Sequence, residues 1–305
     1  MDRKKFLSEK PVGLILRVFA HEEDQIPARL EMVERAVQAS QNAMVDGVPL
    51  IRRIDVLVWS DQRYTEADCG QTASALREAC NKYRSKCPSV QVSEVRHADL
   101  YCSLLNYGVV HQLRRKMDYS IVASAEAFSY MTTETLGAMV DAACQGALAI
   151  GVAINELTDS ILEGRIANTL AMWHNESLMS IGGFDLAAAK PPSDAKEYHF
   201  LVGYSPEMPG SENPGNVQYH ITGVEEVIPL ARMVENFGPC IAPIVPRGAG
   251  VQRYITPDPK TEPKLWQRHW AKMGTKLLRQ EYLLGLIKKH VSYLEGGVME
   301  AYRNQ

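Results

Sequence analysis

No apolar stretch of this 305-residue chain reaches the length of about 20 residues that a membrane-spanning helix needs. The first residues, MDRKKFLSEKPVG, contain no apolar core of the kind found in secretory signal peptides. Runs of basic residues are equally scarce. No such run is longer than the RKK of DRKK at the start of the chain, and the net charge is −3. We therefore expect a cytoplasmic protein with no transmembrane segment and no nucleic-acid partner.

Cysteine is also sparse, and its spacing excludes a zinc-binding protein. The six cysteines, at 69, 80, 87, 102, 144 and 240, lack the paired short spacing of a zinc site. We expect reduced thiols, as is usual in the cytoplasm. Apolar residues make up 46% of the chain and charged residues 23%, which is typical of a globular protein with a sizeable core.

Apolar runs of strand length alternate with segments of helical periodicity through the first half of the chain. The expected strands are 12–20, 54–61, 90–96, 119–125 and 147–154, and the expected helices are 29–44, 70–86, 101–117 and 133–145. Asp46-Gly47 is expected to stop the first of these helices. The alternation predicts an α/β domain with a Rossmann-like, mostly parallel sheet, helices on both faces and ligands beyond the carboxyl ends of the strands.

The second half of the chain is less regular. Residues 203–216, GYSPEMPGSENPGN, are rich in turn-forming residues, and we expect a long loop that closes over a ligand, with a plain surface insertion as the alternative. A Pro-rich stretch at 239–263 precedes a tail that reads as one or two amphipathic helices.

Several polar positions follow the expected strands. The first strand runs into RVFAHEED, which contains Ala20 and Glu22, and the second ends in WSD, which contains Asp61. The segment NYGVVHQLRRKMDYSIVASAEAF contains Asn106 and then Ser124-Ala125-Glu126 after a strand. Taken singly, the acids of the first two segments are more often explained as helix caps.

Two further segments complete the set. The stretch NTLAMWHNESLMSIGGFDL at 168–186 contains Trp173, Gly182, Gly183 and Asp185, where glycine permits close backbone approach and a carboxylate accepts hydroxyl donors. A tight structural turn in which Asp185 caps a helix explains the segment equally well. About 40 residues later, GVEEVIPLARM places Glu225 and Glu226 at the head of a helix. Acids in a first helical turn are favoured by the helix dipole whatever their function.

In this order, the segments resemble the GT-A glycosyltransferases, especially those of family 2. The resemblance implies that residues 1–250 form the transferase domain, with a nucleotide-binding half at about 10–126 and a donor and acceptor half at about 127–250. Residues 251–305 are then a C-terminal helical extension.

The same resemblance implies transfer of a hexosyl group from a nucleotide-sugar to a hydroxyl acceptor, with inversion. Asp61 would contact the base or ribose of the nucleotide, and Asp185 would orient the donor sugar. The full set of positions that would bind the nucleotide and donor is Ala20, Glu22, Asp61, Asn106, Ser124, Glu126, Trp173, Gly182, Gly183 and Asp185.

Glu225 and Glu226 would be the catalytic pair, and Glu226 rather than Glu225 would act as the general base. Ser124-Ala125-Glu126 stands where the family has Asp-x-Asp, so the motif is degenerate and one carboxylate remains for Mn²⁺ or Mg²⁺. His269 or His290 would be the C-terminal histidine that some relatives use on metal.

Two other functions remain open. A sugar nucleotidyltransferase would use a similar sheet, but such proteins usually have a Gly-rich loop with Lys or Arg after the first strand, and HEEDQIP is acidic and lacks glycine. A binding protein that has lost catalysis would explain Ser124-Ala125-Glu126. The sugar, the nucleotide, the acceptor and the oligomeric state are not indicated by the sequence.

Overall fold

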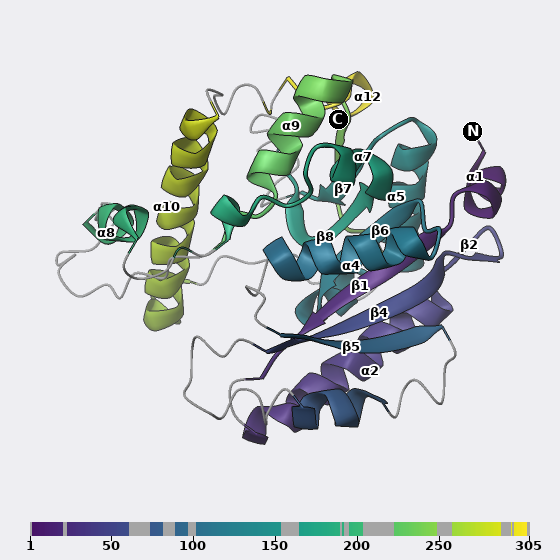
Figure 1. Cartoon of the computed structure of the whole chain (residues 1–305), viewed down its shortest axis with the longest axis horizontal. Coiled ribbons are helices and arrows are strands. Elements are labelled where there is room, and N and C mark those ends of the chain that lie inside the picture. The colour runs from purple at the N-terminus through teal and green to yellow at the C-terminus, as the bar shows by residue number, and fades with distance from the viewer. Residues whose placement is uncertain are drawn as a thin grey trace.

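The computed structural model describes residues 2–20, 23–60, 74–81, 89–96, 102–153, 165–189, 191, 195–203, 223–248, 258–287, 294 and 296–303. Within them lies a seven-stranded sheet with strand order β5-β4-β1-β6-β8-β7-β9 (Figure 1). Its strands are β1 (Val12–Val18), β4 (Ile51–Ser60), β5 (Val90–Arg96), β6 (Tyr119–Ser124), β7 (Ala149–Val152), β8 (Ala167–His174) and β9 (Ile241–Ile244). Strand β8 is antiparallel to β6 and β7, and the other neighbours pair in parallel. The predicted mostly parallel α/β fold is confirmed.

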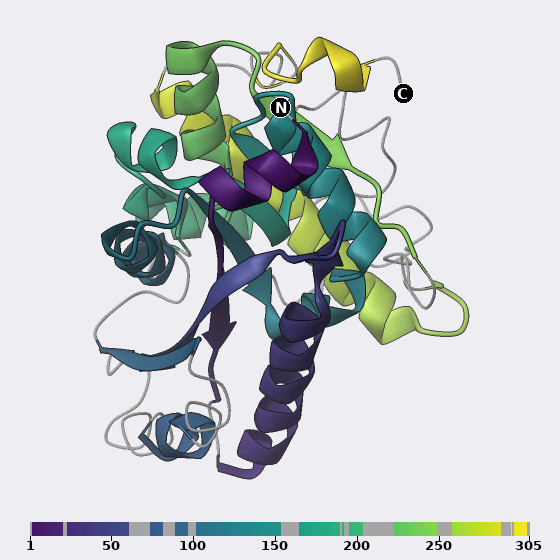
Figure 2. The ribbon, with the colours of Figure 1, turned by 90° about the vertical axis from the view of Figure 1, so that its right-hand side faces the viewer.

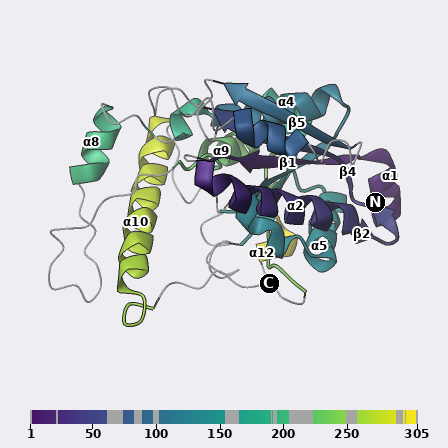
Figure 3. The same ribbon diagram turned by 90° about the horizontal axis from the view of Figure 1, so that it is seen from below.

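Helices cover both faces of this sheet. Helix α4 (Cys102–Arg114) lies on one face, and α2 (Ile26–Asn42) and α5 (Thr133–Cys144) lie on the other (Figures 2 and 3). Helix α1 (Arg3–Glu9) packs on α5, where Arg3 pairs with Asp141. The layers bury β1 on both sides, which explains its continuous apolar run.

The remaining helices lie around the second half of the sheet. They are α7 (Asn175–Ser180), α8 (Lys196–Gly203), α9 (Val227–Phe237), α10 (Pro263–Leu286) and α12 (Glu300–Arg303), with the 3-10 turns η1 (Glu23–Gln25), η2 (Ala125–Tyr130) and η3 (Leu186–Ala188). Helix α10 packs on α9 and α8, on the side of the sheet where the parallel strands end (Figure 1).

One expected boundary is wrong. Helix α2 ends at Asn42, and Asp46-Gly47 forms the turn of a small hairpin between β2 (Met44–Val45) and β3 (Val48–Pro49). Asp46 and Gly47 have φ values of 51° and 75°. Positive φ at both central positions is the type I′ geometry that matches the twist of a two-residue hairpin, so Asp-Gly signals a hairpin here and not a helix end.

Two other expected segments lie only partly within the described residues. Of the helix expected at 70–86, residues 74–81 are described and helical. Of the loop expected at 203–216, all but the first residue lie outside the described part of the chain, so its closure over a ligand stays a prediction. No helix among the described residues is long and apolar enough to span a bilayer.

Candidate functional site

The strand order places a topological switch point between β1 and β6. From β1 the chain passes to β4 and β5 on one side, and then returns to β6 on the other. Loops that leave two such strands diverge, which opens a crevice at their carboxyl ends, where α/β proteins bind their ligands. Arg17, next to the last residue of β1, pairs in register with Ser124, the last residue of β6.

Arg17 is the first member of a buried charged group at this edge. Its Nη1 lies 3.5 Å from Oε1 of Glu225, and the two side chains are only 10% and 9% exposed. Glu225 lies in the turn that leads into α9, so this ion pair connects the end of β1 to a segment more than 200 residues later. Water screens such a pair far less than it screens a pair on the surface.

Glu226 is buried as well, but its charged neighbours differ from those of Glu225. Burial raises the pKa of the Glu226 carboxyl, as does Glu225, whereas Lys276 of α10 and Arg165 act in the opposite direction. Arg165 is buried just before β8. Arg17 thus pairs with Glu225, and Lys276 and Arg165 act electrostatically on Glu226. We call Arg17, Arg165, Glu225, Glu226 and Lys276 the edge cluster.

The Gly-Gly-Phe-Asp segment is held by Asn106 of α4. The Asn106 amide donates to the Phe184 carbonyl and accepts from the Phe184 backbone N–H, both at 2.7 Å. Gly182 and Gly183 have φ values of 95° and 73°, which favour glycine. A Cβ on Gly183 would lie 2.5 Å from Oδ1 of Asn106. The two motifs, distant in sequence, thus form one tight turn.

Asp185 is engaged by protein groups through both carboxylate oxygens. Oδ1 accepts from the backbone N–H of Ala187 at 3.0 Å and caps the short η3 turn. Oδ2 lies 2.9 Å from Nη2 of Arg232 on α9. Trp173 of β8 is fully buried and packs edge-on against Phe184, with ring centroids 5.2 Å apart. In this arrangement both side chains support the turn.

Helix α10 is attached to the same turn by Arg279, which is 1% exposed. Its guanidinium donates to the carbonyls of Ala187 and Ala188 at 2.8 and 3.2 Å, and to Glu197 of α8 at 2.6 Å. Lys276 lies on α10 less than one helical turn before Arg279. The contacts of Arg279 therefore position the helix that brings Lys276 to the edge cluster.

The other expected site residues are described only in part. Ala20 is buried just after β1. Glu22 and Asp61 lie outside the described residues. Ser124 ends β6, Glu126 lies in η2 and His269 lies in α10, but their side chains are outside the described part of the chain. Within that part, no group of three or more His, Cys, Asp or Glu residues is arranged to hold a metal ion. A role for Mn²⁺ or Mg²⁺ stays a prediction.

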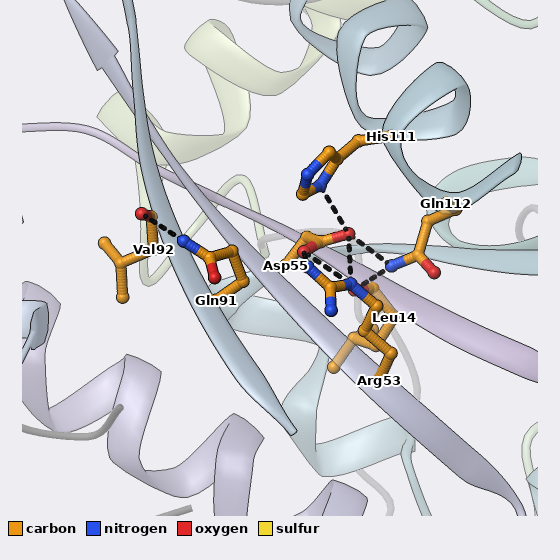
Figure 4. Close-up of polar contacts among 7 residues, drawn as sticks. All are labelled: Leu14, Arg53, Asp55, Gln91, Val92, His111 and Gln112. Atoms are coloured by element: carbon orange, nitrogen blue, oxygen red, sulfur yellow. Dashed lines mark hydrogen bonds and ion pairs between the residues drawn. The ribbon is translucent and has the colours of Figure 1, made fainter. Parts of the chain in front are cut away.

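A second charged network lies inside the domain, between α4 and the sheet (Figure 4). Asp55 of β4 is 1% exposed and accepts hydrogen bonds from Nε of Arg53 at 3.1 Å and Nε2 of Gln112 at 2.7 Å, and Nδ1 of His111 lies 3.2 Å from its Oδ2. Gln112 also donates to the Leu14 carbonyl at 3.3 Å. The network joins α4 to β1 and β4, toward the amino end of the sheet and away from the edge cluster.

Sequence patterns alone missed Arg17, Arg165 and Lys276. For Arg17 a signal was present, because it is the one charged residue inside the apolar run VGLILRVFA. A charge in a strand buried on both faces needs a partner. Asp55 gives the same signal in IDVLVWS. Neither pattern identifies the partner: Arg17 pairs with Glu225, 208 residues later, whereas Asp55 pairs with Arg53 on its own strand and with Gln112 of α4.

Comparisons with known proteins give no match to a family model and none to a curated protein. Among solved structures, a cytidylyltransferase from Leptospira borgpetersenii is 11% identical with a TM-score of 0.35, covering 56% of this chain, which spans 63% of that protein. A 4-diphosphocytidyl-2C-methyl-D-erythritol synthase from Anaerococcus prevotii is 8% identical with a TM-score of 0.42, covering 87% of this chain and 98% of the other. A second synthase of that name is 14% identical with a TM-score of 0.37, and the match covers 83% of this chain and 99% of the other.

These neighbours correct the expected family. They are cytidylyltransferases and not GT-A glycosyltransferases, so the predicted glycosyltransferase membership, the hexosyl transfer and the degenerate Asp-x-Asp motif are wrong. The segments that carried the resemblance have other roles in the fold: Asn106 and Asp185 build a turn, and Glu225 is paired with Arg17. At TM-scores below 0.5, however, the neighbours' own activity does not carry over to this chain.

Proposed function

We propose that this chain is a transferase that binds a nucleoside triphosphate at the carboxyl ends of β1 and β6, and that it transfers the nucleotidyl group to a phosphate-bearing acceptor. The observation that carries the proposal is Arg17, which is buried beside Glu225 at the switch point of the sheet, where Lys276 and Arg165 act electrostatically on the neighbouring Glu226. One of the structural neighbours, a cytidylyltransferase, is named for the same class of reaction.

The charge of the edge cluster suits such substrates. Arg17, Arg165 and Lys276 outnumber Glu225 and Glu226, so the cluster keeps at least one positive charge even with both carboxylates ionised. A triphosphate and a phosphate monoester repel each other, and cations fixed between them lower the cost of bringing them together. The cations come from β1, the segment before β8 and α10, so a glycine-rich loop after the first strand is not required.

In the proposed reaction, an acceptor phosphate oxygen attacks the α-phosphorus of the nucleotide. A new P–O bond forms as the bond to the β-phosphate oxygen breaks, and pyrophosphate leaves. An acceptor phosphate is already ionised at neutral pH, so the attack requires no general base. The role of the protein is to hold the two reactants in line and to neutralise charge.

The first test is equilibrium binding of CTP, UTP, ATP and GTP to the full chain by calorimetry, with and without Mg²⁺. Replacing Arg17 or Lys276 with Gln removes one cation of the edge cluster. We expect affinity to fall about 10-fold or more, because hydrogen bonds to charged groups contribute about 1.5–3 kcal/mol. Pyrophosphate release with a panel of sugar and polyol phosphates then tests the transfer.

A matched control is Lys10→Gln. Lys10 pairs with Asp118 at 3.2 Å before β1, at the opposite edge of the sheet, so its replacement makes the same change of charge away from the site. It should leave nucleotide affinity unchanged. Equal losses from Lys10→Gln and Lys276→Gln would point to a general charge effect, and no nucleotide binding at all would refute the proposal. Binding without turnover on any acceptor would favour a binding protein.

A further inference from the structure

Two aromatic side chains lie at the ligand edge of the sheet, close to Arg17 of the edge cluster. Phe19 directly follows β1, two residues after Arg17, and Trp59 lies near the end of the neighbouring strand β4. The two strands pair in parallel as far as Val18 and Val58, so the next residue of each is aromatic. Their rings are in T-shaped contact, with centroids 6.2 Å apart. An aromatic pair therefore stands at the carboxyl ends of two neighbouring strands, where α/β folds bind ligands.

A cation covers this pair. Arg29 is the fourth residue of α2, which begins beside the end of β1 (Figure 3). Its guanidinium carbon lies over the Phe19 ring, 4.9 Å from the ring centroid. One guanidinium nitrogen, Nη1, also lies 3.7 Å from Sδ of Met32. Phe19 thus contacts a planar cation and a second ring at once; we call Phe19, Arg29 and Trp59 the stack.

The charge of Arg29 has no counterion within the described part of the chain. Arg17 is paired with a carboxylate at 3.5 Å, whereas Arg29 contacts only Phe19 and Met32 among the described residues. Arg29 is also half-buried, and a cation removed from water is costly unless it has a partner. A guanidinium group is planar and weakly hydrated, and it stacks on flat π systems. The stack is therefore suited to a flat, electron-rich ligand.

We propose that the stack binds the nucleobase of the substrate, which lies on the guanidinium of Arg29 while the phosphates reach Arg17. This inference rests on the proposed function, because it places the base of the same nucleoside triphosphate. Two residues of extended chain span at most about 7 Å, so Phe19 and Arg17 lie within the length of one nucleotide. Stacking on aromatic and guanidinium groups is favourable for every base. The stack thus supplies affinity for nucleosides and leaves the choice between bases to other groups.

The test separates the base from the phosphates, by calorimetric titration of the full chain with CTP and with inorganic tripolyphosphate, which has no base. Arg29→Lys keeps the positive charge but removes the planar group. We expect CTP affinity to fall about fivefold or more, on the usual scale of base stacking, with tripolyphosphate affinity unchanged. Arg35→Lys is the matched control, because Arg35 is exposed on the same helix and pairs with Glu31. It should bind both ligands as the wild type does.

A second measurement needs no variant. Isotope-filtered NMR of labelled wild-type protein with unlabelled CTP should show nuclear Overhauser effects from the ring protons of cytosine to the side chains of Arg29 or Phe19. Effects that reach other residues and none of the stack would overturn the inference and leave the proposed function standing. An Arg29→Lys protein that loses affinity for both ligands equally, or for neither, would have the same meaning. If neither CTP nor tripolyphosphate binds, the inference and the proposed function both fail.

Discussion

Replacement of Asp55 with Asn should destabilise the fold strongly, because it removes a charge at the centre of the network in Figure 4. Asn has the same shape and keeps one carbonyl oxygen that can accept from Gln112. What is lost is the negative charge that faces Arg53 and His111 at 3.1 and 3.2 Å. Removing one partner of a buried ion pair costs about 3–5 kcal/mol, because the other charge stays buried without compensation.

The expected loss lies at the lower end of that range. The Arg53 side chain is 16% exposed, so water partly compensates its charge after the change. We therefore expect a loss of about 3 kcal/mol in the free energy of unfolding, a large part of the roughly 5–15 kcal/mol typical of native proteins. Urea denaturation followed by circular dichroism measures it, as a lower midpoint at an unchanged slope.

Asp118→Asn is the control for this experiment. Asp118 pairs with Lys10 at 3.2 Å, but its side chain is 30% exposed and that of Lys10 is 40% exposed. An ion pair this accessible contributes at most about 1 kcal/mol. If Asp55→Asn costs no more than Asp118→Asn, then burial does not make the Asp55 network a major source of stability, and the reasoning is refuted.

Two further predictions concern other parts of the domain. Gly183→Ala should cost about 2–3 kcal/mol in denaturation experiments, the sum of a left-handed backbone and the loss of Asn106 hydrogen bonds. Gly47→Ala, also at positive φ but with no atom within 4 Å of its Cβ, should cost only the backbone part, so equal losses would contradict the Asn106 contact. Burial, with a smaller effect of Lys10, lowers the pKa of His174, so the unfolded state binds more protons just below pH 6.5 and stability should fall as pH drops from 7.5 to 5. His174→Asn keeps a capping side chain and should flatten that slope; unchanged slopes would assign the pH dependence to other groups.

Local sequence patterns determined most of the secondary structure. The buried strand expected at 90–96 is β5, and the helix expected at 133–145 is α5 with one residue fewer. Apolar periodicity is sufficient here because these elements bury the faces that the pattern marks. The same alternation predicted a mostly parallel sheet with its ligand edge at the carboxyl ends, since strands separated by helices pair in parallel.

The identity of the site was decided by tertiary structure. Asn106 and Gly183 belong to two separate motifs of the expected family, yet they meet as two parts of one turn. Glu226 was recognised as an acid at a helix start, but its burial and the charges of Lys276 and Arg165, 50 and 61 residues away in the sequence, follow only from the tertiary structure. Electrostatic interactions depend on distance in space and on burial, and neither is contained in the spacing of residues along the chain.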